Sequence, residues 1–241
     1  LLPDCYLHGR GAAVPRYLDD LMGIAVVHIA CGAAHCAVVA DTGMLYTWGD
    51  GSSGQLGHGD KRSFKRRRPV LFAAATRVQC AGVACGRAHT IAVDRDGVLY
   101  GFGSDKHGQL GLGPRGGSAD GEDHFRDAMG CVVSPAALGA PPSPADGAEA
   151  GLAWSVVACG EAHSLALCTK GGAYAWGNAE DGRLGLPLGG RGSIDDAVVS
   201  APRRLTLGGA PAVMVDVGND FSAVLDGDGR LWGCGANWKG Q

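Results

Sequence analysis

The chain has 241 residues, of which 42 are glycine, more than twice the usual share of about 7%; abundant glycine is typical of tight turns between short strands. Hydrophobic residues make up 46% of the chain, which excludes simple disorder because enough apolar surface is present to build a core. The net charge of −3 argues against a protein built chiefly to coat nucleic acid, and no run approaches the roughly 18 uncharged apolar residues of a membrane span.

Four segments of the chain share one spacing of glycines. Each opens on a short anchor, and the anchors occupy residues 31–35, 85–89, 159–163 and 217–221. Counted from the glycine of each anchor, glycine recurs 11, 17 and 22 residues later in all four copies. The anchors follow one another at intervals of 54, 74 and 58 residues, which identifies a repeat protein with one lengthened copy.

The recurring positions are interpreted as structural. They comprise a glycine in the anchor, a histidine or phenylalanine at its end, a large apolar residue and a second glycine. They are Gly32, His35, Trp48 and Gly49; Gly86, His89, Phe102 and Gly103; Gly160, His163, Trp176 and Gly177; and Gly218, Phe221 and Gly235.

Each copy contains two apolar runs separated by a polar turn that ends in glycine, which predicts a β-hairpin. The first runs cover 37–39, 91–93, 165–167 and 223–225, and the return strands cover 45–48, 99–102, 173–176 and 231–234. One flanking strand is expected before the anchor, as at 25–29. An outer strand is expected to follow a proline, and these prolines are Pro15, Pro69, Pro135 and Pro202. Four short strands in a unit of about 55 residues predict the blade of a β-propeller.

The periodicity divides the chain into six segments. Residues 1–18 are expected to be the tail of a preceding repeat, 19–72 the first unit, 73–113 the core of the second, 154–205 the third and 206–241 a truncated fourth. Residues 114–153 form a low-complexity insertion rich in proline, alanine and glycine. Such a composition favours disorder, although the charged residues 120–126 could contact a partner.

The repeat resembles a known family. Ala-Cys-Gly-x-x-His at 30–35, Gly-x-Leu-Tyr-x-Trp-Gly at 43–49 and Gly-Gln-Leu-Gly-x-Gly at 54–59 are similar to the regulator of chromosome condensation repeat. The resemblance covers residues 15–241 apart from the insertion. It implies an all-β fold, a seven-bladed propeller of four-stranded antiparallel blades, of which this chain would supply a partial ring of about four repeats. On this basis the chain is expected to be a fragment.

The recurring cysteine and histidine of each anchor raise the alternative of a metal site, which the sequence disfavours. Residues four apart along a strand lie about 13 Å apart, and the fourth copy replaces the pair with Val217 and Phe221. We expect buried imidazoles bonded to backbone in a tight corner, and large apolar residues packed between blades. No metal, cofactor, phosphate loop or catalytic constellation is predicted, so a non-enzymatic role is favoured.

One cluster of charge departs from the repeat. Six basic residues fall within eight positions, and they are Lys61, Arg62, Lys65, Arg66, Arg67 and Arg68. Once these six are set aside from a chain of net charge −3, the remaining residues carry −9. Two interpretations stay open: a solvated loop between blades, or a loop that contacts an acidic partner or nucleic acid or acts in nuclear import.

Two classes of function remain, because a fold does not decide a function. The first is a protein–protein interaction propeller, a scaffold or regulatory module of a larger protein, whose partner would meet the basic loop. The alternative, implied by the resemblance, is guanine-nucleotide exchange on a small GTPase of the Ran type; none of the exchange residues can be matched to positions here. Contact with nucleic acid or chromatin is unsupported by the net charge. Nine cysteines in so large a chain favour a reducing, intracellular compartment, cytoplasmic or nuclear.

Overall fold

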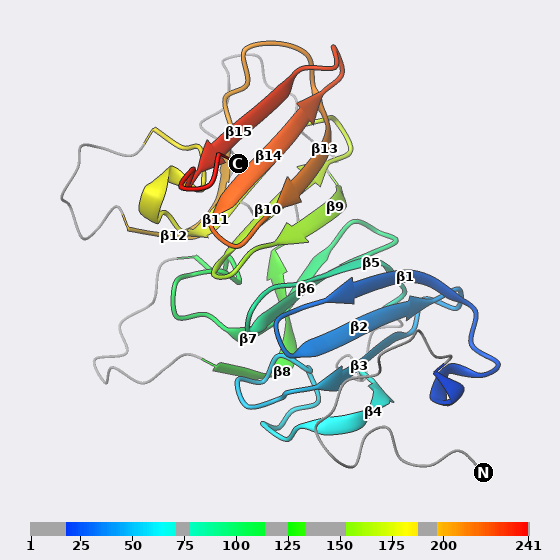
Figure 1. Ribbon diagram of the computed structural model, residues 1–241. Helices are drawn as coiled ribbons and strands as arrows, with labels where there is room; N and C mark the ends of the chain where they lie inside the picture. Colours follow the sequence, from blue (N-terminus) through cyan, green and yellow to red (C-terminus); the bar gives the residue numbers. More distant parts are fainter. Residues whose placement is uncertain (1–17, 71–77, 114–124, 134–152, 188–196, 241) are drawn as a thin grey trace.

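Antiparallel sheets make up nearly all the regular structure. The computed structural model describes residues 18–70, 78–113, 125–133, 153–187 and 197–240. These residues form three four-stranded sheets and one three-stranded sheet, which follow one another in chain order (Figure 1). The described helical segments are single 3-10 turns, η1 (Asp19–Leu21) and η3 (Glu180–Gly182), and no helix among the described residues is long and apolar enough to cross a bilayer.

Each sheet is a meander in which neighbours in sequence are neighbours in space. The first contains β1 (Val26–Cys31), β2 (His35–Ala40), β3 (Leu45–Gly49) and β4 (Phe64–Pro69). The second contains β5 (Cys80–Cys85), β6 (His89–Asp94), β7 (Leu99–Ser104) and β8 (Phe125–Val133). The third contains β9 (Trp154–Cys159), β10 (His163–Cys168), β11 (Ala173–Asn178) and β12 (Val198–Arg204). The fourth contains β13 (Ala212–Val217), β14 (Phe221–Asp226) and β15 (Leu231–Gly235).

The predicted hairpins are the second and third strands of each sheet. The turn between these strands shows how the sequence specifies a hairpin. Between β6 and β7, the Asp94 carboxylate accepts hydrogen bonds from the backbone N–H groups of Asp96 and Val98, at 3.0 and 2.8 Å. Gly97 completes the turn with a φ of 76°, a left-handed conformation that glycine adopts without steric cost. The Asp/Gly turn therefore fixes the register of the strands on either side.

Burial along the second strand of each sheet reveals how the sheets stack. Every residue of β6 and β10 is buried, whereas buried and partly buried residues alternate along β14. The inner sheets have a neighbour on both faces, so both sets of side chains are covered, while the fourth sheet is covered on one face only. In the second, third and fourth sheets, the first strand packs against the first two strands of the sheet before it.

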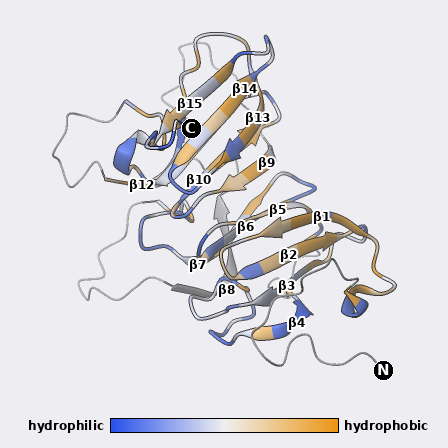
Figure 2. Ribbon diagram, viewed as in Figure 1, coloured by the Kyte–Doolittle hydropathy of each residue, from blue (hydrophilic) through white to orange (hydrophobic). Residues whose placement is uncertain are grey.

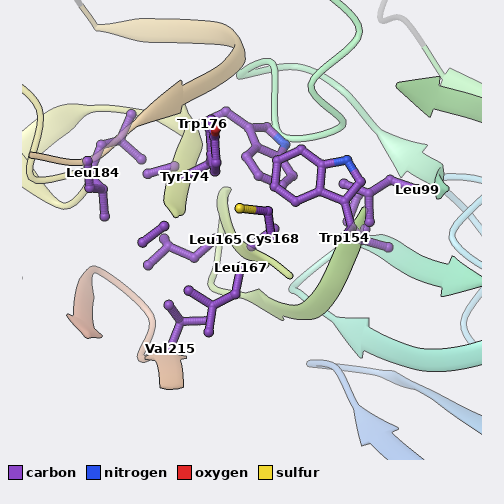
Figure 3. Packing of buried hydrophobic residues seen from close by; sticks show 14 of the residues in the cluster. Leu99, Trp154, Leu165, Leu167, Cys168, Tyr174, Trp176, Leu184 and Val215 are labelled. Carbon is purple, nitrogen blue, oxygen red and sulfur yellow. The ribbon is translucent and has the colours of Figure 1, made fainter. Parts of the chain in front are cut away.

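The largest core cluster joins the second, third and fourth sheets. Trp154 meets the Tyr174 ring edge-on at 5.0 Å between centroids and lies beside Trp176, as Figure 3 shows. A second cluster, which includes Val39, Leu45 and Phe102, joins the first two sheets. The core therefore lies between blades, as the all-β propeller prediction requires.

The open faces of the end sheets carry exposed apolar side chains. On β1, Val27 and Ile29 are 61% and 69% exposed, and on the fourth sheet Met214 and Leu231 are 59% and 74% exposed. Figure 2 shows the corresponding hydrophobic colour on β1 and β13. These are the faces that a neighbouring blade covers elsewhere in the chain.

The predicted position of the outer strands is wrong. β4 ends at Pro69 and β12 contains Pro202, so the strand precedes or includes the proline and does not follow it. A proline lacks an N–H and is tolerated there because each of these strands has a hydrogen-bonded neighbour on one side only. Pro15 and Pro135 lie outside the described residues.

The predicted low-complexity insertion at 114–153 contains a strand. β8 pairs with β7 from Ser104 opposite Phe125 to Leu99 opposite Val133, and so supplies the outer strand of the second sheet. The composition averaged over forty residues did not reveal the nine-residue segment at 125–133, which has a higher β propensity than its surroundings. Residues 114–124 and 134–152 lie outside the described residues.

Candidate interaction surface

The anchor histidines join one blade to the next. His35 Nε2 lies 2.9 Å from Thr90 Oγ1 of the second sheet, and that hydroxyl donates to the backbone carbonyl of Gln55 at 2.8 Å. The same arrangement recurs at the next two junctions, through His89, Ser164 and Gln109 and through His163, Ser222 and Arg183. Each hydroxyl thus bridges an imidazole and a carbonyl of the preceding sheet, an arrangement we call the junction relay.

The junction relay fixes the tautomer of each imidazole. A hydroxyl has one proton, and in each relay that proton goes to a carbonyl, which can only accept. The imidazole Nε2 must therefore carry a proton and donate to the hydroxyl. The Nδ1 atoms of His35, His89 and His163 are then unprotonated, and all three are buried without a hydrogen-bond partner. Burial lowers the pKa of these three histidines to about 4, 3 and 4.

The sequence-based argument against a metal site placed Cys31 and His35 on one strand, and this placement is wrong. Cys31 and His35 do not share a strand, because β1 ends at Cys31 and a turn separates it from β2. The imidazole also bonds to a side-chain hydroxyl of the next blade, where a backbone partner was expected. The hydroxyls were missed, although a Thr or Ser directly follows the anchor in three copies; in the first copy Cys36 takes this place.

The anchor glycines are required by close approach of the imidazole. A Cβ atom on Gly86 would lie 2.1 Å from His89 Cε1 and 2.5 Å from the Gly160 carbonyl oxygen of the next sheet. Gly32 and Gly160 likewise lie against the imidazole of their own anchor and a glycine carbonyl of the next sheet. At Gly218 the ring of Phe221 takes the place of the imidazole. Glycine is therefore the residue that lets each anchor turn lie against both its own ring and the next blade.

The large apolar residues of the repeat pack on the preceding blade. Phe102 lies against Gly57 and Trp176 against Gly111, glycines of the loops that follow the return strands. Trp176 Nε1 also donates to the Gln109 carbonyl at 2.9 Å. In the fourth sheet Cys234 contacts Gly185 in the same way. Trp48, in the first sheet, is only partly buried.

The junction between the third and fourth sheets contains a buried guanidinium in an ion pair, whereas Arg87, which pairs with Glu161 between the second and third sheets, is exposed. Where the first two copies have Gln55 and Gln109, the third has Arg183, whose side chain is 6% exposed and lies 2.6 Å from an Asp220 carboxylate oxygen. Asp220 in turn stands where the first three copies have alanine. The two changes compensate each other, because a buried guanidinium needs an acceptor.

This pairing predicts a strong coupling in a double-mutant cycle. Arg183→Gln and Asp220→Ala are each expected to lower the free energy of unfolding by about 1–3 kcal/mol. The first leaves Asp220 without its cation, and the second leaves the buried guanidinium with only the longer ion pairs to Asp181, at 3.3 Å, and to Glu180, at 4.0 Å. The double variant restores the residues of the other copies and should recover much of that loss. Urea denaturation measures all four proteins, and additive losses would contradict the pairing.

Four of the six predicted basic residues lie on a strand, not in a loop. Lys65, Arg66, Arg67 and Arg68 are part of β4, the outer strand of the first sheet, and Lys61 and Arg62 precede it. This strand has no apolar face, so its sequence lacks the apolar run that predicts the other strands. At the outer edge of a sheet neither face needs to be covered by a neighbouring sheet, so charged residues are tolerated there. We call these six residues the basic surface, coloured hydrophilic over β4 in Figure 2.

Two aromatic rings hold guanidinium groups of the basic surface. Arg68 lies over Phe64 at 4.4 Å from the ring centroid, and Arg67 lies over Tyr46 at 5.1 Å. Phe64 in turn meets His58 edge-on at 5.3 Å. Burial, followed by the Arg68 charge, lowers the pKa of His58, so this imidazole adds no positive charge at neutral pH. The arginines are therefore held in place by π contacts while they keep their charge.

Acidic neighbours neutralise the basic surface only weakly. Arg66 Nε lies 3.8 Å from Asp20, and Arg62 Nε lies 3.8 Å from Asp60. Both arginine side chains are about four-fifths exposed, at 83% and 80%, and exposed pairs of this kind contribute about 0–1 kcal/mol. The surface therefore remains strongly positive on a chain that is otherwise negative.

Sheets of antiparallel strands that repeat in sequence and join through one recurring contact define a segment of a β-propeller. Models of the regulator of chromosome condensation (RCC1) repeat match residues 42–93, 96–167 and 170–225, and a second model matches 26–55, 80–109 and 154–183. The chain belongs to this repeat family, which confirms the resemblance drawn from the anchors.

Known proteins share this repeat over nearly the whole chain. The chain is 34% identical to the E3 ubiquitin-protein ligase HERC2 of Homo sapiens, over 94% of this chain and 4% of HERC2. It is 33% identical to the serine/threonine-protein kinase Nek9 of Xenopus laevis, over 97% of this chain and 22% of Nek9. Yeast RCC1 (Prp20), solved with Kap60 bound, superposes with a TM-score of 0.68 at 22% identity, over 93% of this chain and 46% of that chain. The chain thus spans less than half of each protein it matches here, and the yeast likeness shows the fold alone.

Proposed function

We propose that this propeller segment is a protein–protein interaction module, a scaffold or regulatory part of a larger protein, and that the basic surface contacts its partner. The observation that carries the proposal is the position of that surface. Arg62 and Arg66 are exposed on the outer strand of a blade and its preceding loop, while the repeated positions are occupied by contacts within and between blades. A cluster of positive charge in which the Arg62 and Arg66 side chains are about four-fifths exposed is available for an acidic partner.

The comparisons support a modular role. HERC2 is a ubiquitin ligase and Nek9 is a kinase, and this chain matches a small share of each. We infer that the segment serves its own protein in the same way, as one module beside others. The described cysteines are free thiols, which supports the proposed intracellular compartment, cytoplasmic or nuclear.

Neutralising the basic surface is expected to remove a partner without unfolding the blade. In the full-length protein, Lys65→Gln, Arg66→Gln and Arg68→Gln together should reduce partner capture by about tenfold or more, since screened charges set the association rate and part of the affinity. Quantitative cross-linking with mass spectrometry compares the variant with the parent, and Tm should change by no more than a few degrees because these side chains are exposed. Unchanged capture of every partner would contradict the proposal.

Guanine-nucleotide exchange on a small GTPase of the Ran type is the second candidate. It is favoured by the fold shared with Prp20p of Saccharomyces cerevisiae, whose binding properties toward Gsp1p and histones are known. The release rate of labelled GDP from a panel of small GTPases separates the two functions. Acceleration by the full-length protein favours exchange, and its absence across the panel leaves the interaction module.

A further inference from the structure

The outer edge of β4 can accept another strand. β4 is the last strand of its sheet and pairs with β3 on one side. Among the described residues, no other backbone segment bonds to its outer edge. An edge of this kind is a template for an extended peptide, which adds to the sheet through main-chain hydrogen bonds.

The composition of β4 distinguishes it from the outer strands of the other blades. β12 is interrupted by Pro202, which removes a main-chain donor from the middle of the strand. β8 has one arginine and one aspartate and so no net charge. β4 has four consecutive basic residues, and its proline is its last residue, Pro69. Among these three strands it alone combines a continuous run of N–H groups with a high positive charge.

Basic side chains cover both faces of β4. The pairing of β4 with β3 shifts register between Thr47 and Gly49, so residues 65–67 form an irregular segment opposite one residue of β3. Neighbouring residues on either side of an extended chain point in different directions, so the four consecutive basic residues 65–68 do not share one face. Arg67 contacts Tyr46 of β3, and Arg68 contacts Phe64 of its own strand. A strand added beside β4 would meet positive charge at four consecutive positions, 65–68, and acidic residues directly opposite basic ones stabilise a strand pair by about 0.2–1 kcal/mol each.

Of the two stacked arginines, Arg68 is exposed and Arg67 is partly buried. A guanidinium that stacks on a ring uses its face for the ring, and its N–H groups point outward in the plane. Arg67 Nε is buried and has no acceptor. A carboxylate on an adjacent strand can pair with the exposed guanidinium of Arg68, whose rotamer is already restrained by the Phe64 ring, which lowers the entropy cost of binding.

We propose, on the basis of the proposed function, that the partner of the basic surface is an extended acidic peptide segment that adds to the free edge of β4 as a further strand. Because both faces of β4 are basic, the segment has consecutive and not alternating acidic residues, over about five positions. Nucleic acid is disfavoured for two reasons. It has no peptide groups to pair with a strand edge, and the faces of Tyr46 and Phe64, on which a base could stack, are occupied by guanidinium groups.

The test uses three probes with the full-length protein, each measured by fluorescence anisotropy. The first is a labelled dodecapeptide with five consecutive glutamates at its centre, and the second is the same peptide N-methylated at alternate glutamates. The third is a labelled single-stranded oligothymidylate of twelve nucleotides. N-methylation keeps the charge and removes the main-chain donors, so it separates strand addition from simple electrostatic attraction.

We expect the unmodified peptide to bind about tenfold more tightly than its N-methylated form and more tightly than the oligonucleotide. Arg66→Gln with Arg68→Gln should weaken peptide binding about tenfold. Arg203→Gln with Arg204→Gln removes two charges from β12 and should leave binding unchanged. Amide exchange at residues 64–68 should slow when the peptide binds.

Three results would overturn the inference: no binding of the peptide, equal binding of the two peptides, or tighter binding of the oligonucleotide. The proposed function is judged separately, by partner capture with the neutralised full-length protein. If capture is lost while the peptide does not bind, the interaction module stands and strand addition is wrong. If capture is unchanged, the proposed function itself fails.

Discussion

Lowering the pH from 6.5 to 4 is expected to destabilise the propeller steeply. In the folded chain the pKa values of His35, His89 and His163 are lowered by burial to about 4, 3 and 4, whereas an unfolded histidine has a pKa of about 6.5. Within this window the unfolded state binds more protons, so stability is complete above pH 6.5 and is lost as the pH falls toward 4. Each histidine contributes about 1.4 kcal/mol per pH unit, and three together about 4 kcal/mol per unit.

The junction relay gives the structural reason for this pH dependence. Nε2 already donates to a hydroxyl, so an added proton must go to Nδ1, which is buried and has no acceptor. Urea denaturation at pH 7, 6 and 5 measures the slope. His163→Phe serves as the matched control, because Phe221 is the natural residue at this position in the fourth copy. This variant should reduce the slope by about one third, and an unchanged slope would show that the buried imidazoles do not cause it.

Gly86→Ala is expected to lower the free energy of unfolding by about 3 kcal/mol or more. The new methyl group would lie 2.1 Å from His89 Cε1 and 2.5 Å from the Gly160 carbonyl oxygen. The ring could move only by breaking its bond to Ser164, and the carbonyl belongs to the backbone of the next blade. The change therefore displaces either a junction relay or a strand end.

Gly233→Ala is the matched control for that substitution. Gly233 lies in β15, and a Cβ atom there would have no neighbour within 4 Å. Its effect should stay within about 1 kcal/mol and can be favourable, since alanine reduces the entropy of the unfolded chain. Thermal and urea denaturation of both variants check the difference. Similar stabilities of the two variants would contradict the account of the anchor glycines.

The fold could be predicted from the sequence because its signals are local. The Asp/Gly turns and the apolar runs beside them specify the hairpins, and Gly97 illustrates how one residue fixes a turn. The outer strands lacked such a signal. β4 has no apolar face, and β8 lies inside a segment whose average composition suggested disorder. An edge strand is stabilised by pairing with its neighbour, which a pattern search along one strand does not detect.

The basic surface was predicted only in part, because its charge is visible in the sequence and its strand pairing is not. The cluster at 61–68 stands out in sequence by charge alone, but its place on a free strand edge depends on pairing with β3. The aromatic partners of Arg67 and Arg68 depend on the same pairing and on strand geometry. The hydroxyls of the junction relay had a sequence signal, since Thr90, Ser164 and Ser222 occupy equivalent positions. Their role as bridging groups could not be predicted, because each hydroxyl bonds to an imidazole and a carbonyl of the preceding sheet.

The junction relay also bears on how a chain of this kind can grow by duplication. The imidazole and the carbonyl always belong to the earlier sheet and the hydroxyl to the later one. A copied unit that has both halves brings a matching surface on each face, so it fits between any two sheets of the same type. Arg183 and Asp220 are different, because they form the ion pair that joins these two sheets. A recombination that separated this pair would leave an ionised group in a junction built for neutral ones, so the third and fourth sheets are expected to be inherited together.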